Sequence, residues 1–511
     1  MVLDRTFPVA RATALLLGGV SMSRRNSLSA LPLLALQLAV AGCGGGGGGG
    51  NPPPSDIGTL AYVATECRDT PEGFFERQAL HILHGERDVT VMETPSVGPV
   101  TTGLGGYCRF NGLGRWGDGS VSRDAFQGLA VSPDGAIVVF EVSDDFSVYP
   151  PLPLHLPPEQ KGIFLVRADG SGLHSLGPPS RVPFFEIGNS GGTFIGGSFS
   201  FSPDGRMITF ADLGPDAAGN EAGQVWTLDV GSGLRRQVTH LPPAVPAANH
   251  RFDTPSVENP GFFDNQTIGF LTLANPDGLN ADEGHFLPLL VGSDGSDLRA
   301  APAPVTSPDS GIDFHFVITG DKPAAVMLFM PGQAKNPTTL LGRTSIFEIF
   351  AVDGRNLLQL TNFQRVDTFT GTLDVHRQTV FFLASADPFG TNPSENCQIF
   401  SIDRLGGNLR QLTQFSEGNH STLGCYFGPG SGCAIIDVTQ DSTTGMLVFY
   451  SSCDPLGTNP RGGQMFAMRP DGSGLRQLTQ TRGLVTQQDH TVMDELPGPV
   501  AYGPYGNPGS H

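Results

Sequence analysis

Gly188-Asn-Ser-Gly-Gly192 has the spacing G-x-S-x-G of a serine nucleophile in acyl transfer. In that motif a strand precedes the serine and a helix follows it, because the sharp turn between them exposes the hydroxyl group. Here Ser190 lies among further glycines and is followed by a predicted strand, Thr193–Ile195. The motifs HExxH, Walker A and SxxK do not occur. We therefore expect no nucleophile at Ser190 and no catalytic residue elsewhere.

Two of the 12 histidines stand apart, because their predicted strands could line a common channel. His315 falls within the apolar segment Ile312–Thr319, and His490 falls in a strand predicted close to the end of the sequence. If both strands line one central channel, the two imidazoles could bind a shared ligand or take part in acid–base or metal chemistry. A packed or solvated histidine is the simpler interpretation of each.

Two nearly identical loops are rich in oxygen atoms that could bind a cation. Ser385-Ala-Asp-Pro-Phe-Gly-Thr-Asn-Pro393 is matched by Ser452-Cys-Asp-Pro-Leu-Gly-Thr-Asn-Pro460. Ca²⁺ takes about six to eight oxygen ligands, but Asp387 and Asp454 are the only acidic residues of these loops. Asp and Asn side chains also bond to their own loop backbone, and Gly permits tight bends. We favour this structural interpretation over calcium, and we expect no metal and no cofactor.

The first 42 residues have the features of an export signal. Arg24 and Arg25 precede the apolar segment Leu28–Val40, and small residues follow it. This order is typical of a secretory signal, and the apolar segment is shorter than the roughly 20 residues of a transmembrane helix. Met22 is an alternative start, which would make residues 1–21 an extension of the true sequence.

Val40-Ala41-Gly42-Cys43 resembles the lipobox of bacterial lipoproteins. The resemblance implies cleavage before Cys43 and lipidation of its sulfur; an ordinary signal cleaved near Ala41 is the alternative. Residues 43–56, with Gly44–Gly50 and a triple proline, then form a flexible tether that ends in a stiffer spacer. These features predict an exported chain held at the envelope membrane by lipid alone, on its periplasmic or surface face.

Six further cysteines follow the tether, and an even number in an exported protein predicts disulfide bonds. Sequence proximity favours two of the pairs, and the two remaining cysteines form the third. A zinc site is the alternative, although no CxxC spacing occurs. The pairs are Cys425–Cys433, Cys67–Cys108 and Cys397–Cys453.

Composition excludes several classes of protein. Glycine and proline account for 69 and 42 of the 511 residues, too many for a helical bundle or a coiled coil, whereas 39% hydrophobic residues suffice for a packed core. The net charge of −19 repels phosphate backbones, so nucleic acid is not expected as a partner.

Apolar strands joined by Asp-Gly turns recur along the chain. Ser132-Pro-Asp-Gly135 and Ser202-Pro-Asp-Gly205 each connect two apolar strands, and this turn chemistry favours a tight hairpin. A second hairpin follows each first one, and its turn glycines recur every 52 to 66 residues. They are Gly170, Gly231, Gly295, Gly354, Gly406 and Gly472. Two hairpins in each repeat predict a four-stranded sheet, which is one blade of a β-propeller.

The two ends of the repeat region set the predicted number of blades. Three strands without a first strand begin it, and one strand is left over at its end. The first three are Leu60–Ala64, Ala79–His84 and Val89–Glu93, and the last is His490–Asp494. Their pairing predicts an all-β fold, a single closed propeller of seven four-stranded blades at residues 57–503, followed by a disordered tail at 504–511. Six or eight blades are the alternatives, because Val500–Tyr502 is another candidate strand.

These repeats resemble those of TolB-type propellers. The resemblance is carried by the two Ser-Pro-Asp-Gly turns, Ile163-Phe-Leu165 and Arg410-Gln-Leu-Thr413, and it covers roughly residues 57 to 500. TolB itself also has an N-terminal α/β domain, and no helix-periodic region of that size precedes the repeats here. The resemblance implies an exported propeller of a bacterial envelope, a class composed mostly of binding scaffolds, although fold analogy does not fix a function.

Two functions fit these observations. The first is a non-catalytic, lipid-anchored scaffold that binds an envelope protein or glycan, with Pro95–Asp124 and Tyr149–Glu159 as the expected contact loops. The second is a periplasmic or surface enzyme that acts on polysaccharide or peptide in the propeller channel, which requires titratable side chains to converge there. We favour the scaffold because the anchor, the tether and the repeats are present and a catalytic set is missing.

Overall fold

The chain divides into two units, Met1–Pro52 and Pro53–His511. The computed structural model describes only residues of the second unit, most of them in strands. The described ranges are 57–70, 73–94, 97–100, 126–143, 156–181, 199–243, 257–272, 274–279, 287–302, 317–318, 324–329, 348–353, 356–363, 368–374, 379–394, 396–415, 435–441, 443–451, 453–458, 464–480, 485–486 and 492–501.

This part of the chain is all-β. Its helical turns are two short 3-10 helices, η1 (Pro158–Gln160) and η2 (Pro276–Gly278). Within the described ranges, no helix has the length and apolar composition needed to cross a membrane.

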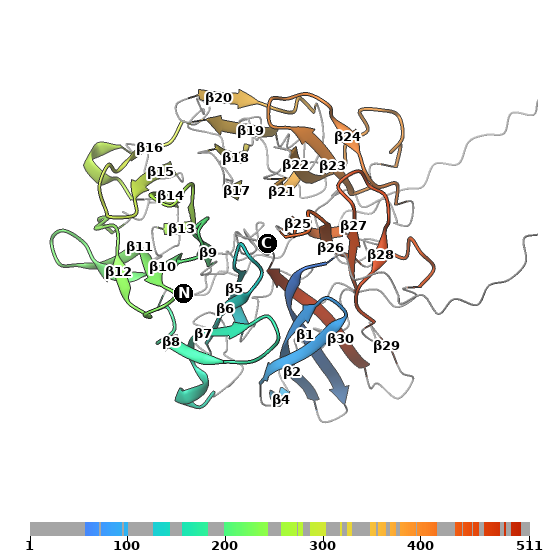
Figure 1. The fold of residues 1–511 in the computed structure, drawn as a ribbon, viewed down its shortest axis with the longest axis horizontal. Coiled ribbons are helices and arrows are strands. Elements are labelled where there is room, and N and C mark those ends of the chain that lie inside the picture. Colours follow the sequence, from blue (N-terminus) through green and yellow to red (C-terminus); the bar gives the residue numbers. More distant parts are fainter. Residues whose placement is uncertain are drawn as a thin grey trace, which may run out of the picture. The chain divides into compact units, whose positions relative to one another are not determined.

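The described strands form seven antiparallel sheets, numbered here in chain order (Figure 1). Sheets 2 to 7 have four strands each, paired in chain order. They are β5 (Phe126–Val131), β6 (Ile137–Val142), β7 (Gly162–Arg167) and β8 (His174–Gly177) in sheet 2; β9 (Ser200–Phe201), β10 (Met207–Pro215), β11 (Glu221–Asp229) and β12 (Arg235–Gln237) in sheet 3; β13 (Val257–Phe262), β14 (Thr267–Thr272), β15 (Leu287–Gly292) and β16 (Arg299–Ala300) in sheet 4; β17 (Val317–Ile318), β18 (Ala324–Phe329), β19 (Glu348–Asp353) and β20 (Asn356–Gln359) in sheet 5; β21 (Thr368–Asp374), β22 (Thr379–Ala384), β23 (Gln398–Asp403) and β24 (Arg410–Gln411) in sheet 6; and β25 (Ile435–Gln440), β26 (Leu447–Ser451), β27 (Gln464–Met468) and β28 (Arg476–Gln477) in sheet 7.

Sheet 1 contains strands from both ends of the described chain. Its strands are β1 (Thr59–Thr70), β2 (Gly73–His84), β3 (Arg87–Glu93), β4 (Val97–Val100), β29 (Val485–Thr486) and β30 (Val492–Ala501). β30 pairs with β1 from Ala61 to Asp69, as the sequence led us to expect. The prediction of four strands is wrong for this sheet, because β1 and β2 are twelve residues long and their extension provides an edge for β4. Val500 belongs to β30 and not to a separate strand.

The Ser-Pro-Asp-Gly motif makes the turn between the first two strands of a sheet. Ser132 Oγ donates to Asp134 Oδ1 at 2.6 Å and accepts from the backbone N–H of Ile137 at 3.0 Å. The hydrogen bond from Ser132 lowers the pKa of Asp134. Gly135 has a φ of +69°, a backbone conformation that residues other than glycine rarely adopt. Ser202, Asp204 and Gly205 repeat this arrangement in sheet 3.

The threonine of the Gln-Leu-Thr motif follows the fourth strand, and its side chain pairs with a buried glutamine at the start of the third strand. Thr413 Oγ1 donates to Gln398 Oε1 at 2.8 Å and accepts from the N–H of Ile399 at 2.9 Å. Gln224 with Thr239, and Gln464 with Thr479, make the same pair in sheets 3 and 7. The threonine therefore satisfies a backbone donor that no water can reach.

Thr413→Val should lower the free energy of unfolding by about 1–3 kcal/mol. Valine has the shape of threonine but leaves the buried N–H of Ile399 without an acceptor, which costs its desolvation. Chemical denaturation of the purified domain measures the loss. Thr413→Ser keeps the hydroxyl group and should lose clearly less; a Thr413→Val variant as stable as the natural chain would show that these hydrogen bonds do not contribute to stability.

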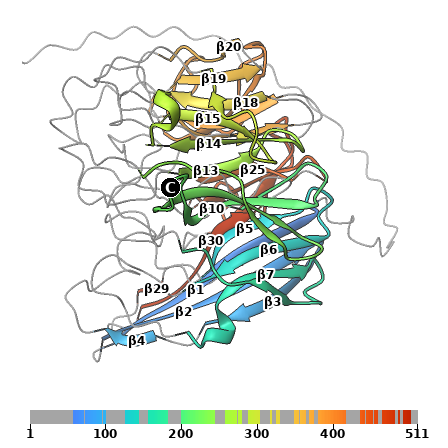
Figure 2. The same ribbon diagram turned by 90° about the vertical axis from the view of Figure 1, so that its left-hand side faces the viewer.

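Successive sheets pack face to face through hydrophobic clusters. Phe140 and Phe164 of sheet 2 pack with β1 and β2, and Figure 2 shows these strands side by side. Further clusters join sheets 2 and 3, 3 and 4, 5 and 6, and 6 and 7, and β13 contacts β17 between sheets 4 and 5. Leu60 and Tyr62 of β1 pack with Val448 and Met465 of sheet 7. Each sheet therefore has two neighbours, and sheet 7 is next to sheet 1.

Each sheet has two distinguishable ends. The turns between strands one and two and between strands three and four lie at one end, called here the hairpin end, and the loop between strands two and three lies at the other, the loop end. Hairpin ends of neighbouring sheets touch, since the N–H of Asp204 donates to Asn265 Oδ1 at 3.1 Å. The described chain begins at this end: the N–H of Gly58 donates to Asp441 Oδ2 at 2.5 Å, and Thr59 Oγ1 donates to the carbonyl of Gly135 at 2.6 Å.

Candidate functional site

Most of the residues singled out from the sequence lie outside the described ranges. The lipidation candidate Cys43, the histidines His315 and His490, Ser190, and the cysteines Cys108, Cys425 and Cys433 are all in this group. Cys67 lies in β1, where only its backbone is described. These predictions are therefore untested.

The two loops considered for calcium lie at the loop ends of sheets 6 and 7. In the first, Asp387 Oδ1 accepts from the N–H of Asn392 at 2.7 Å, and the buried Asn392 amide donates to the carbonyls of Ala386 and Asn396 at 3.1 and 2.8 Å. One carboxylate oxygen of Asp387 and the amide nitrogen of Asn392 thus hold the loop backbone. Among the described residues, no three His, Cys, Asp or Glu side chains gather as metal ligands.

Cys397 and Cys453 lie at the bases of these two loops. Both are buried in the hydrophobic cluster between sheets 6 and 7, and both sulfurs are disulfide-bonded. The two residues come from neighbouring sheets, so a bond between them would cross a sheet interface.

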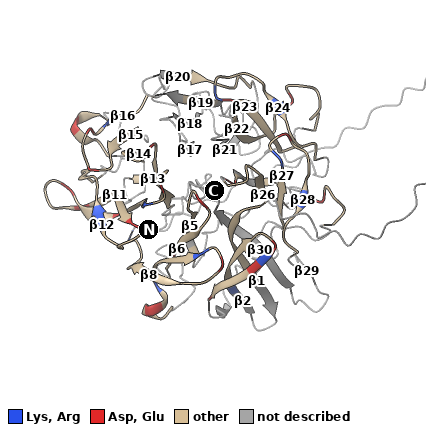
Figure 3. Cartoon of the chain, viewed as in Figure 1, with Lys and Arg blue, Asp and Glu red and all other residues tan. Residues whose placement is uncertain are grey.

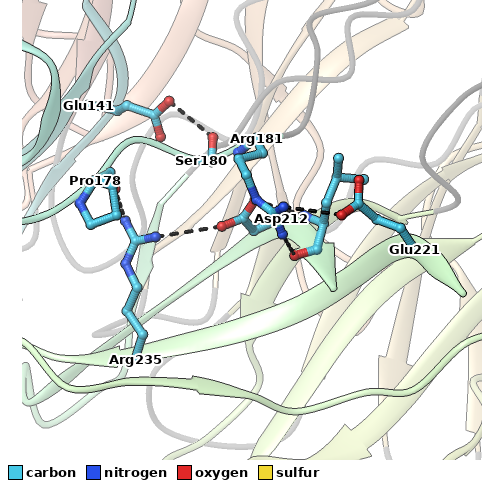
Figure 4. Close-up of polar contacts among 8 residues, drawn as sticks. Glu141, Pro178, Ser180, Arg181, Asp212, Glu221 and Arg235 are labelled. Atoms are coloured by element: carbon cyan, nitrogen blue, oxygen red, sulfur yellow. Dashed lines mark hydrogen bonds and ion pairs between the residues drawn. The ribbon is translucent and has the colours of Figure 1, made fainter. Parts of the chain in front are cut away.

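The structure also brings together a set of charged side chains that the sequence did not suggest. Glu141 of β6 in sheet 2 and Asp212 of β10 in sheet 3 both lie at the interface of these two sheets (Figure 4). Only 2% of the surface of Glu141 and 5% of that of Asp212 are exposed. Arg235 of β12 lies beside them, with Nη1 at 3.5 Å from Asp212 Oδ2. We call Glu141, Asp212 and Arg235 the interface triad.

The triad holds the segment that connects sheet 2 to sheet 3. Ser180 Oγ donates to Glu141 Oε1 at 3.0 Å, and the N–H of Arg181 donates to Asp212 Oδ1 at 2.7 Å (Figure 4). Arg235 Nη2 donates to the carbonyl of Pro178, and its guanidinium lies over the ring of Phe210 at 5.3 Å. Arg235 Nε and Glu141 Oε2, both buried, have no hydrogen-bond partner in the described structure.

Each carboxyl group of the triad has a raised pKa. Burial raises the pKa of Glu141 to about 7, and the negative charge of Asp212 adds to this, while hydrogen bonds from Ser180 and the charge of Arg235 act against it. Burial also raises the pKa of Asp212, against the hydrogen bonds from the backbones of Arg181 and Leu213 and the charge of Arg235. Glu141 can therefore gain or lose a proton near neutral pH, at a place closed to solvent.

Two residues of the triad, Glu141 and Arg235, occupy positions that are apolar in some of the other sheets. Glu141 is the fifth residue of β6, and the fifth residues of β14 and β22 are the buried Leu271 and Leu383. Arg235 takes the register position of Leu409 and Leu475, which pack against the cores of sheets 6 and 7.

A one-residue insertion in sequence explains this exchange. Gly231-Ser-Gly-Leu-Arg-Arg-Gln has one residue more before its glutamine than Gly472-Ser-Gly-Leu-Arg-Gln. The insertion moves Leu234 out of the core, where 70% of its surface is exposed, and places Arg235 at the interface. This difference between repeats was the signal available in the sequence. Figure 3 marks the positions of the described acidic and basic residues along the ribbon.

No protein-family model matches the chain, and no curated protein matches it. Among solved structures, the chain is similar to the acylaminoacyl peptidase of Pyrococcus horikoshii, with a TM-score of 0.46 and 11% identity over 84% of this chain and 52% of the peptidase. This chain thus spans about half of the peptidase.

Two other solved structures are similar to this chain. Oligogalacturonate lyase from Vibrio parahaemolyticus has a TM-score of 0.41 and 8% identity, over 84% of this chain and 91% of the lyase. Putative TolB from Agrobacterium tumefaciens has a TM-score of 0.30 and 13% identity, over 60% of this chain and 90% of that protein. Likeness at this level does not extend to activity.

Proposed function

We propose that the chain is an exported, lipid-anchored β-propeller that acts as a non-catalytic binding scaffold in a bacterial envelope. In this proposal the seven sheets are the blades of one closed ring. The observation that carries it is the pairing of β30 with β1, which puts both ends of the described chain into one sheet. Packing of sheet 7 against sheet 1 supports the same arrangement. A unit joined in this way provides a rigid platform for loops.

The interface triad supports a structural rather than a catalytic role for its own residues. Glu141 and Asp212 are buried between two sheets and hold the connecting segment 178–181. A general acid must lie within hydrogen-bond reach of its substrate, which groups this deeply packed do not achieve without opening of the interface. We also infer that Cys397 and Cys453 are bonded to each other and link blades 6 and 7.

The anchor rests on the sequence, where Cys43 completes a lipobox-like segment. Cys43→Ser should move the protein from the membrane fraction to the soluble envelope fraction, because the substitution removes the sulfur that carries the lipid. Fractionation of cells that express either form measures this. If Cys43→Ser remained as firmly bound to membranes as the natural chain, the lipid anchor would be wrong.

The scaffold role is tested with the purified domain from residue 57. We expect it to retain an envelope protein or glycan on an affinity column and to release no sugar or peptide from envelope material. Release of either product would support instead the enzyme that acts in the channel, where His315 and His490 are the residues to substitute first.

A further inference from the structure

The loop ends of sheets 6 and 7 carry two exposed apolar side chains on matched loops. Phe389 and Leu456 follow the Asp-Pro pairs of their loops and have 50% and 41% of their surfaces exposed. Gly390 and Gly457 come next, with φ values of +69° and +67° and no atom within 4 Å of the place where a Cβ would lie. Each loop therefore projects one apolar side chain from an open tip.

Side-chain hydrogen bonds hold the two loops in place. In sheet 6, Asn392 bonds to three backbone carbonyls, and Thr391 Oγ1 donates to Gln411 Oε1 at 2.8 Å. In sheet 7, Thr458 Oγ1 donates to Gln477 Oε1 at 2.9 Å. The half-cystines Cys397 and Cys453 lie at the loop bases. A loop whose backbone is already held in place loses little conformational entropy when a partner covers its apolar side chain, which favours binding.

The described parts of the two tip loops are acidic. Residues 385–392 and 453–458 each contain one acidic side chain, Asp387 and Asp454, and no Lys or Arg. Such a surface attracts a cationic partner.

A tether attached to the described chain would join it at the hairpin end; this step rests on the proposed lipid anchor. The described chain begins at the hairpin end, next to Asp441, and residues 43–56 precede it. A glycine-rich tether of this length spans on average about 20 Å. A six-residue strand separates the two ends of a sheet by roughly a further 20 Å. The loop end is therefore the end farther from the point where a tether would join the sheets.

We propose that the loops 385–392 and 453–458 form a docking edge for a protein segment that carries an apolar side chain flanked by Lys or Arg. Phe389 and Leu456 contact the apolar side chain, and Asp387 and Asp454 provide the charge that selects the basic flanks. The carboxylate of Asp387 also holds its own loop, so charge and loop shape come from the same residue.

The test places a photo-crosslinking amino acid in the full chain, in cells that export it, at Phe389, Leu456, Leu234 or Leu405. The last two are matched controls, because they lie at the hairpin end and are more exposed, at 70% and 81%. We expect protein adducts from positions 389 and 456 in at least tenfold excess over 234 and 405. Peptide mapping of the adducts should find the crosslink at an apolar residue next to Lys or Arg.

A charge variant completes the test. Asp387→Asn with Asp454→Asn keeps a side-chain acceptor in each loop but removes the charge, and it should lower the adduct yield at position 389 at least threefold. Asp169→Asn with Asp471→Asn, at the hairpin end, should leave it unchanged. The docking edge would be overturned by equal adducts at all four positions, by adducts with lipid alone, by no adducts, or by a yield insensitive to the charge variant. A chain that fractionates as soluble and keeps the adduct pattern would contradict the anchor and support the docking edge.

Discussion

Glu141→Gln is expected to raise the free energy of unfolding by about 3 kcal/mol at pH 8 and to leave it nearly unchanged at pH 4. The carboxyl group is fully buried, and its pKa rises from an ordinary value of 4.5 to about 7 in the folded protein. Between these two pH values the folded chain holds a proton that the unfolded chain releases. The stabilising effect of this proton is complete below pH 4.5 and is lost as the pH rises through 7, where a buried negative charge remains.

The measurement is a series of denaturation curves from pH 4 to pH 8 for both proteins. The difference between the two proteins reports on Glu141 and on its interaction with Asp212, because distant carboxyl groups such as that of Asp134 affect both proteins alike. Glu221→Gln is the control, since that side chain is 60% exposed and its pairing with Arg181 should contribute little. A constant difference between natural chain and Glu141→Gln across the pH range would show that the carboxyl group titrates normally.

Loss of the disulfide proposed between Cys397 and Cys453 should lower the free energy of unfolding by about 4 kcal/mol. The bond would close a loop of 56 residues and restrict the unfolded chain, and in the folded chain it would tie sheet 6 to sheet 7. Cys397→Ala, Cys453→Ala and the double variant should all lose the same amount, because removing either sulfur removes the whole bond.

Denaturation under non-reducing conditions compares the three variants, and peptide mapping of the natural chain should yield one linked fragment that contains both residues. Alanine is used because a serine hydroxyl group would add the cost of a buried polar atom. Additive losses in the double variant would mean that the two cysteines bond to different partners.

The sheets were predictable from sequence because local chemistry determines their turns. Ser132 and Asp134 close their turn with side-chain hydrogen bonds, and Gly135 supplies the positive φ, so the motif alone indicates a hairpin. The pairing of the strand near residue 492 with β1 was predictable by counting strands. The extra strands of sheet 1 were not, because nothing local to Val97–Val100 or Val485–Thr486 marks them as partners of long strands.

The interface triad could not be predicted in the same way. Glu141 lies in an apolar strand, and Asp212 and Arg235 lie beside it only because sheets 2 and 3 stack face to face. The distances from Glu141 to Asp212 and Arg235 depend on how two repeats pack against each other. The spacing of residues within one repeat does not reveal this packing. The inserted residue before Arg235 was visible, but its effect follows from the register of β11 and β12.

The pairing of Asp69 with Val492 joins residues 423 positions apart, so β1 leaves the ribosome long before its partner exists. At about 5–20 residues per second, that interval is at least roughly 20 s. Throughout it, one edge of β1 offers open backbone donors and acceptors, the kind of template on which chains aggregate. Secretion of a still-unfolded polypeptide would postpone this hazard until β30 has been made, and a translation product that ends before residue 492 would keep its sticky edge and become a substrate for proteases.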